Sequence, residues 1–172
     1  MSKAPTPPYP PDLDEDDEPP VALGDLKDAV IADVDWSNER GRGVAWKRVE
    51  LRRCRLTGVE LAESVLNDVT FSECRLDLAG LRLTRLERVV FRDCRMSECE
   101  LYEAALEDVL FERCELRGAS LDGVRIERVE LRGCDLSGVG GVASLRGARI
   151  AWDDVVQNAP VFAVGLGLEL VE

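Results

Sequence analysis

Large apolar side chains recur at every fifth position along most of the chain. Of the 22 positions taken five apart from Ile31 to Leu136, 21 carry a large apolar residue, and only Gly41 breaks the run. Two residues before these positions, a second series holds a small side chain, mostly Val, Ala or Cys, with Glu39 as the one exception. Five residues advance an α-helix by about 500°, and an odd step reverses the faces of a strand. The pattern therefore predicts a backbone that turns once in every repeat, with both series pointing inward.

A longer period of twenty residues is superimposed on the period of five. Five cysteines and three phenylalanines follow it: Cys54, Cys74, Cys94, Cys114 and Cys134, with Phe71, Phe91 and Phe111. Four sides of five residues then make one coil, and successive coils stack as parallel strands about 4.8 Å apart. We expect an all-β solenoid of about six coils with a packed core and no ligand cavity on its axis.

The repeat units resemble those of a known family. The segments CRLTG at 54–58, CELRG at 114–118, ASLDG at 119–123 and CDLSG at 134–138 are similar to the unit of the pentapeptide repeat proteins, and the resemblance spans about residues 29–152. It implies a right-handed quadrilateral parallel β-helix. The slot before the central residue departs from the family, because Arg and Glu replace the usual Asp or Asn; this changes the surface and leaves the fold expectation intact.

The two ends differ from the repeats. Residues 1–23 hold seven of the eight prolines and a run of acids, and we expect a disordered tail. The alternative is a short recognition segment, since the stretch PTPPYPP can adopt a polyproline II conformation. Residues 24–152 form the expected β-helix, with Trp36 and Trp46 closing its first coil and a one-residue slip of register before Leu145. Residues 153–172 are expected to contain a short helix and to serve as a C-terminal cap or as a dimerisation segment.

Composition excludes several classes of function. The net charge is −12, which argues against direct nucleic-acid binding, and the absence of histidine excludes Ser-His and Cys-His catalytic pairs and metal sites that contain histidine. We expect no enzyme activity, no cofactor and no bound metal. The six cysteines all occupy inward slots, where they act as small apolar side chains and suit a reducing compartment. With no membrane span or secretory signal in the sequence, we expect a cytoplasmic protein.

Two surface patches are candidates for a partner. One wall of the predicted solenoid carries an acidic stripe with one tyrosine: Glu60, Glu63, Glu100, Tyr102, Glu103 and Asp122. Outward branched residues offer a second, apolar contact: Val65, Val90 and Leu110. In each case a solvated surface without a partner is the alternative.

Two functions are consistent with these features. The first is a non-enzymatic scaffold or protein-protein interaction module with an unknown protein partner, which needs nothing beyond the rigid repeats. The second is implied by the resemblance: some pentapeptide repeat proteins imitate duplex DNA, bind DNA gyrase and protect it from quinolones or inhibit it. The near-neutral repeat region favours the first, because residues 29–152 hold 22 acids and 20 bases. A homodimer formed through the C-terminal segment is a further expectation.

Overall fold

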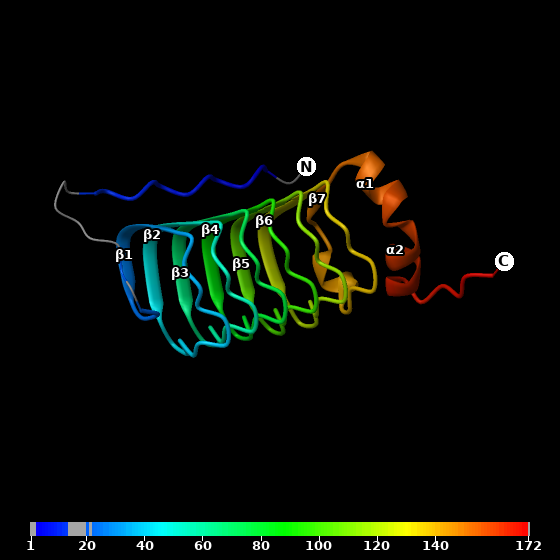
Figure 1. Ribbon diagram of the computed structural model, residues 1–172. Helices are drawn as coiled ribbons and strands as arrows, with labels where there is room; N and C mark the ends of the chain where they lie inside the picture. Colours follow the sequence, from blue (N-terminus) through cyan, green and yellow to red (C-terminus); the bar gives the residue numbers. More distant parts are fainter. Residues whose placement is uncertain (1–2, 14–19, 21, 172) are drawn as a thin grey trace.

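The chain folds into a β-solenoid of about six coils with a short helical part at its C-terminal end (Figure 1). The computed structural model describes residues 3–13, 20 and 22–171. Its elements are β1 (Leu26–Ala32), β2 (Ala45–Arg52), β3 (Val65–Ser72), β4 (Arg85–Arg92), β5 (Ala105–Glu112), β6 (Arg125–Arg132), η1 (Val142–Leu145), β7 (Arg149–Ile150), α1 (Trp152–Gln157) and α2 (Ala159–Gly165). The strands are parallel and form one sheet in sequence order. The predicted fold class is confirmed.

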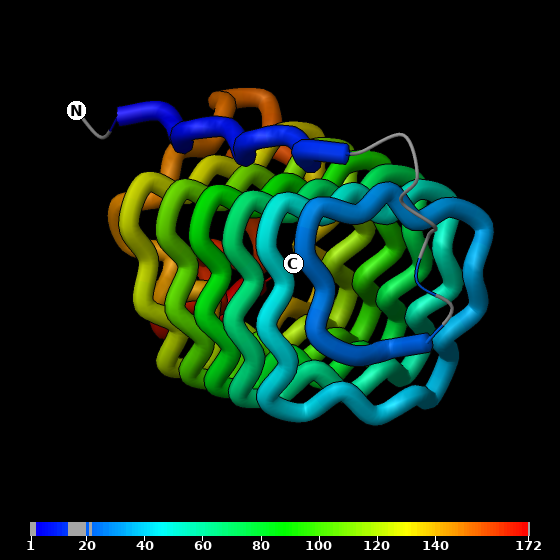
Figure 2. Tube along the Cα trace, turned by 90° about the vertical axis from the view of Figure 1, so that its left-hand side faces the viewer, coloured from blue at the N-terminus to red at the C-terminus, as the bar shows by residue number. Residues whose placement is uncertain are grey.

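Residues twenty positions apart lie side by side on neighbouring coils. Leu66 pairs with Leu86 and Leu86 with Leu106, and the same spacing holds across every pair from β1–β2 to β5–β6. Isolated bridges with the same spacing continue the ladder on the other walls, and the coils form four-sided loops (Figure 2). The register slips once, since Leu131 pairs with Ile150, nineteen residues on. Both the period of twenty and the slip were predicted from the sequence.

Each five-residue side ends at a left-handed corner. Every fifth residue from Asp28 to Gly138 has a positive φ, between 49° and 74°. Glycine adopts this conformation without strain at corners such as Gly58, but most corners carry a side chain, which costs about 1–2 kcal/mol each. The corner hydrogen bonds run between coils; the N–H of Arg53, for example, donates to the carbonyl of Ser72 at 2.9 Å. Stacking thus offsets the local strain.

The core is a filled column of side chains. Phe71 stacks on Phe91 with a ring-centroid distance of 4.8 Å, and Phe91 stacks on Phe111 at 5.1 Å. Trp36 and Trp46 are buried in the first coils, as predicted, with their rings 6.4 Å apart. At Gly41, where the apolar series breaks, the side chain of Leu23 occupies the space that a larger residue would fill.

The C-terminal helices cover the last coil. In α1 the N-cap residue is Ala151, and Asp153 lies in the first turn of the helix. The side chain of Asn158, between α1 and α2, is buried; its amide oxygen accepts from the N–H of Leu136 and its amide nitrogen donates to the carbonyl of Cys134. Within the part of the chain that the structure describes, no helix is long and apolar enough to cross a membrane.

The N-terminal segment does not extend away from the solenoid. Residues 3–13, which fall within the expected disordered tail, lie along the outside of the coils in an extended conformation (Figures 1 and 2). The acidic run at residues 14–18 lies outside the described residues, so the expected disorder there stays a prediction.

Candidate functional site

The predicted acidic stripe lies on one wall of the solenoid, which we call the acidic face. Bridges align Arg40, Glu60, Gly80, Glu100 and Ser120 along the middle of this wall. The coil geometry places the other residues of the stripe beside them, with Tyr102 and Asp122 two positions after the bridge and Glu63 and Glu103 at the corner. The structure therefore brings all six predicted residues onto the same wall.

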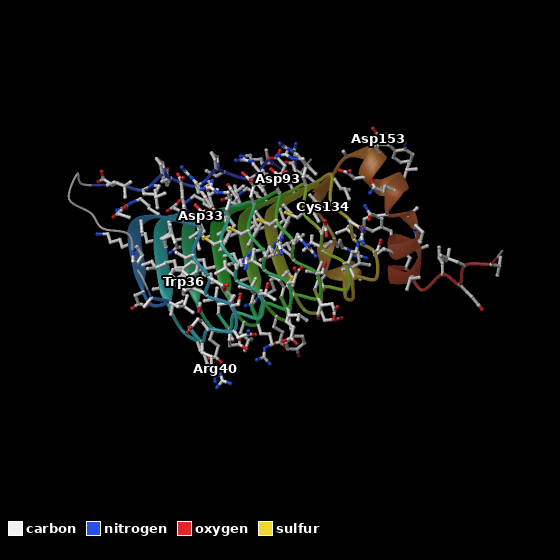
Figure 3. The ribbon with its side chains drawn as sticks, in the orientation of Figure 1. Asp33, Trp36, Arg40, Asp93, Cys134 and Asp153 are labelled. Carbon is white, nitrogen blue, oxygen red and sulfur yellow. The ribbon has the colours of Figure 1, made fainter. Side chains whose placement is uncertain are left out.

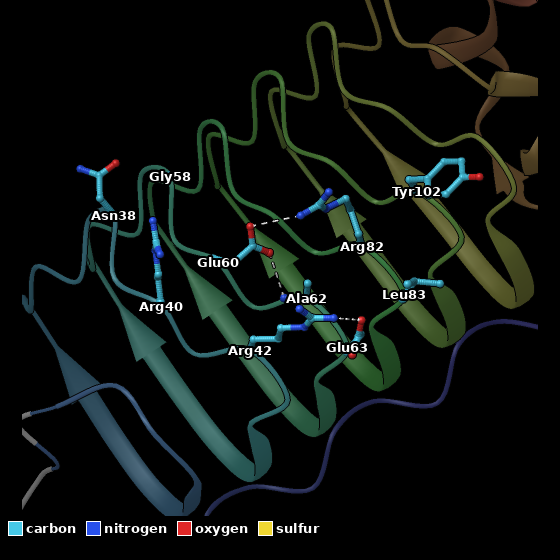
Figure 4. A pocket seen from close by; sticks show the side chains of 10 residues that line it. All are labelled: Asn38, Arg40, Arg42, Gly58, Glu60, Ala62, Glu63, Arg82, Leu83 and Tyr102. Atoms are coloured by element: carbon cyan, nitrogen blue, oxygen red, sulfur yellow. Dashed lines mark hydrogen bonds and ion pairs between the residues drawn. The ribbon is translucent and has the colours of Figure 1, made fainter.

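Arginines divide the acidic face into two halves. Arg42 contacts Glu63, and Arg82 lies 3.5 Å from a carboxylate oxygen of Glu60 (Figure 4). Arg82 also lies 3.2 Å from a carboxylate oxygen of Glu100. Arg40 projects from the side of the solenoid opposite the side that carries Asp33 and Asp93 (Figure 3). The end near the first coil is therefore close to neutral.

The far half of the acidic face keeps its negative charge. Among the described residues, neither Glu103 nor Asp122 forms an ion pair with an arginine or lysine. The hydroxyl of Ser120 donates to Asp122 at 3.2 Å. Hydrogen bonding to Glu103, with the charges of Glu103 and Asp122, raises the pKa of Tyr102 above its ordinary value. Tyr102 thus stays a neutral hydroxyl at physiological pH within a local excess of negative charge.

A shallow pocket joins the two halves. Its apolar lining comes from Ala62, Leu83 and Tyr102 (Figure 4). Its charged lining residues are Arg40, Arg42, Glu60, Glu63 and Arg82. Leu83 occupies a left-handed corner with φ of 57° and is 50% exposed, and Tyr102 is 45% exposed. Two exposed leucines occupy such corners, Leu78 and Leu83, and of the two only Leu83 lines this pocket.

Sequence reasoning did not assign Arg40, Arg42 or Leu83 to this pocket. Arg40 and Arg42 belong to the coil with the broken repeat at Gly41, so the face assignment did not include them. Leu83 occupies a corner slot, where the other residues are mostly Gly or charged. Leucine occupies that slot at Leu78, on the neighbouring wall, and at Leu83, and this departure from Gly or charge is the signal that would have drawn attention to Leu83.

The residues of the predicted apolar contact lie on two adjoining walls. Val65 is 39% exposed on the wall centred on Leu66, whereas Val90 and Leu110 stack on the next wall. Val90 is only 7% exposed because the N-terminal prolines lie over it; Val90 and Leu110 line a groove with Pro5, Pro7 and Pro8.

The cysteines form no metal site or disulfide in the structure. All six are buried free thiols, and the thiols at 54, 74, 94, 114 and 134 repeat the same hydrogen bond to the carbonyl two residues earlier. Burial raises the pKa of Cys99 to about 12. The described residues contain no group of three or more His, Cys, Asp or Glu placed to hold a metal ion. These thiols therefore act as packing groups.

Proteins similar to this chain are found among the solved structures. No curated protein matches it significantly. Solved structures similar to it include QnrB1, a plasmid-mediated fluoroquinolone resistance protein (12% identity, 70% of this chain and 71% of that chain, TM-score 0.39). Others are Rfr23 from the cyanobacterium Cyanothece (19% identity, 69% and 86%, TM-score 0.28) and a pentapeptide repeat protein of the Arabidopsis thaliana thylakoid lumen (17% identity, 74% and 72%, TM-score 0.37).

The assignment rests on the family model and on the geometry. The model of the pentapeptide repeat region matches residues 44–121 and 64–140, which together cover more than half of the chain. The same residues supply the coils that stack at intervals of twenty. The chain belongs to the pentapeptide repeat family.

Proposed function

We propose that this chain is a non-enzymatic protein-protein interaction module and that the acidic face is its contact surface. The observation that carries the proposal is the pair of exposed side chains Leu83 and Tyr102 beside the carboxylates of Glu103 and Asp122, which form no ion pair among the described residues. Aromatic and apolar anchors surrounded by polar groups are typical of the residues that dominate binding energy at interfaces.

The repeat architecture supports a preformed surface. Leu83 and Tyr102 are held by ladders of main-chain hydrogen bonds; the N–H of Leu83 donates to the carbonyl of Tyr102 at 2.9 Å. Binding to such a surface loses little conformational entropy. The partner that fits is a protein with an apolar pocket for Tyr102 and Leu83 and a basic residue facing Glu103 and Asp122.

The test is affinity purification from the native host with two variants of the full chain. We expect a protein that co-purifies with the wild type and with Val65→Ala, on another wall, but is lost with Leu83→Ala/Tyr102→Ala. Equal recovery with both variants would show that the acidic face is not the contact surface.

A second candidate is imitation of duplex DNA toward DNA gyrase, which the family resemblance implies. The negative charge around Glu103 and Asp122 favours imitation of DNA. The ion pairs that arginines form with Glu60, Glu63 and Glu100 disfavour it, because they interrupt a continuous negative strip. A supercoiling assay with and without a quinolone distinguishes the two. Inhibition or protection by the wild type, lost when Glu60, Glu63, Glu100 and Glu103 are changed to Gln, would favour the second candidate; no effect would eliminate it.

We also propose a homodimer through the C-terminal segment. Large apolar side chains there are more than half exposed: Trp152, Val156, Val164, Leu166, Leu168, Leu170 and Val171. Light scattering of Leu166→Ser/Leu168→Ser/Leu170→Ser tests this without removing Asp154 and Asn158, whose side chains bond the last coil. We expect a dimeric mass for the wild type and a monomeric mass for the variant. An unchanged mass would contradict the proposed dimer.

The six buried thiols support a cytoplasmic location, because unpaired cysteines persist best in a reducing compartment.

A further inference from the structure

Three main-chain N–H groups of the N-terminal segment bond aspartates on one corner of the solenoid. The bonds join Thr6 N to Asp108 Oδ1 at 2.8 Å, Tyr9 N to Asp68 Oδ1 at 3.0 Å and Asp12 N to Asp28 Oδ1 at 3.0 Å. The donors are three residues apart, and the acceptors are forty residues, or two coils, apart. The segment therefore runs antiparallel to the stacking direction, with residue 12 near the first coil.

The spacing matches polyproline II geometry. Three residues of a polyproline II helix rise about 9.3 Å, and two coils of a parallel β-solenoid rise about 9.6 Å. The chain reads Thr-Pro-Pro-Tyr-Pro-Pro-Asp from residue 6 to residue 12. Proline has no N–H, so the only main-chain donors in this stretch are the three that face an aspartate.

Arginines on the intervening coils hold the acceptors in place. Arg48, Arg88 and Arg128 each direct Nε and an Nη to the aspartate one coil earlier. We call this corner the Asp/Arg edge; its members are Asp28, Arg48, Asp68, Arg88, Asp108 and Arg128. The carboxylates remain charged: hydrogen bonds from Arg48 and from the N–H of Asp12 lower the pKa of Asp28 to about 2.

Side chains of the segment also contact the edge. The guanidinium of Arg88 lies 5.6 Å from the centroid of the Tyr9 ring, a cation–π contact. Pro5, Pro7 and Pro8 line a groove with Val90 and Leu110, two of the outward apolar residues noted in the sequence. The partners of the segment thus come from several coils, those of Asp28, Asp68, Arg88 and Asp108, so only a correctly stacked solenoid presents them all.

We propose that the Asp/Arg edge, with the apolar groove beside it, is a recognition surface for polyproline II segments of the pattern x-Pro-Pro-x-Pro-Pro-x, and that residues 6–12 are its intramolecular ligand. The aspartates of the edge accept hydrogen bonds from the main-chain N–H of every third residue of the segment. The distance between these aspartates is set by the stacking of the coils. Because the acidic face lies on another wall, this inference does not depend on the proposed function, and the two are tested separately.

Amide hydrogen exchange of the full chain, measured by NMR, tests the register. The amides of Thr6, Tyr9 and Asp12 are expected to exchange about tenfold or more slowly than those of Ala4 and Leu13, which lie at the two ends of the same segment. Equal exchange at all five amides would overturn the proposal.

A second experiment tests recognition by adding a labelled peptide of residues 3–13 to full-length variants. Thr6→Pro/Tyr9→Pro/Asp12→Pro keeps the polyproline II conformation and removes every donor, so its edge is vacated; Pro10→Ala is the matched control that keeps all three donors. We expect the peptide to bind the triple variant at least about tenfold more tightly than the wild type or Pro10→Ala, whose edges are occupied. Absence of binding to the triple variant, or equal binding to all three proteins, would overturn the proposal.

Slow exchange accompanied by a mass that increases with concentration in the wild type and in Pro10→Ala but not in the triple variant would overturn the intramolecular assignment, because it would show that a second copy supplies the segment.

Discussion

The side-chain amide of Asn158 takes the place of a main-chain peptide beside Leu136. Its oxygen accepts from the Leu136 N–H at 2.9 Å, and its nitrogen donates to the Cys134 carbonyl at 3.1 Å. One coil earlier, the main chain of Asp135 makes the equivalent two bonds, to the N–H of Leu116 and to the carbonyl of Cys114. Asn158 therefore ends the ladder by satisfying groups that a seventh coil would otherwise bond.

Replacing Asn158 with Leu is expected to lower the free energy of unfolding by about 3 kcal/mol, because a buried N–H and a buried carbonyl each lose a partner. Urea unfolding followed by circular dichroism measures this. Gln157→Leu, which introduces the same side chain at an exposed neighbouring position, is the control and should change stability by less than about 0.5 kcal/mol. Similar effects for the two variants would contradict the capping role.

The phenylalanine column makes a second prediction. Phe91 stacks against both Phe71 and Phe111 and is fully buried. Phe91→Ala should cost about 4 kcal/mol, since it leaves a cavity between two coils. Phe91→Leu, which introduces the residue type found at Leu51 and Leu131 of the same ladder, should cost about 1 kcal/mol in the same unfolding experiment. Equal costs would show that the column is not closely packed.

Leu83 provides a test of corner strain. Its φ of 57° is costly for any residue with a Cβ, and its side chain is half exposed. Leu83→Gly should therefore raise the free energy of unfolding by about 1 kcal/mol, while Leu83→Ala, which keeps the Cβ, should not. Thermal denaturation of both variants checks this, and a loss of stability in the glycine variant would contradict the account.

The paired aspartates predict how stability depends on pH. Hydrogen bonds from Arg48 and the Asp12 N–H lower the pKa of Asp28 in the folded protein to about 2, below its value of about 3.9 in an unfolded chain. The stabilisation from Asp28 is therefore complete above about pH 5 and is lost as the pH falls toward 2. The difference in stability between the wild type and Asp28→Asn should shrink over this range. A difference that stays constant or grows on acidification would contradict the assignment.

Periodicity in the sequence was sufficient to predict the solenoid, because each coil repeats the same inward pair and each repeat constrains the next. It also placed Glu60, Glu100 and Tyr102 on one wall. It did not place Arg40 and Arg42 there, because their coil lacks the apolar residue at position 41, where Leu23 substitutes from outside the repeat.

The contacts of the two ends were not predicted for a different reason. Asn158 and residues 3–13 bond main-chain groups or corner side chains of coils far away in sequence, and no local pattern encodes such pairs. The available signal was the sequence around Tyr9, in which single residues with a main-chain N–H alternate with pairs of prolines. This pattern is informative only when the distance between coils is known, because the three-residue spacing of the donors matches two coils.

The central claim, that residues twenty apart stack directly over one another, is tested most directly by spin-label distances. A label fixed at Asp35→Cys would be paired in turn with labels at Arg95→Cys, Glu115→Cys and Asp135→Cys, all on one ladder of bridges; the native thiols are buried. The stacked coils predict mean distances that increase by about 4.8 Å at each step. Unequal increments, or a distance that fails to grow with each added twenty residues, would contradict the stacking.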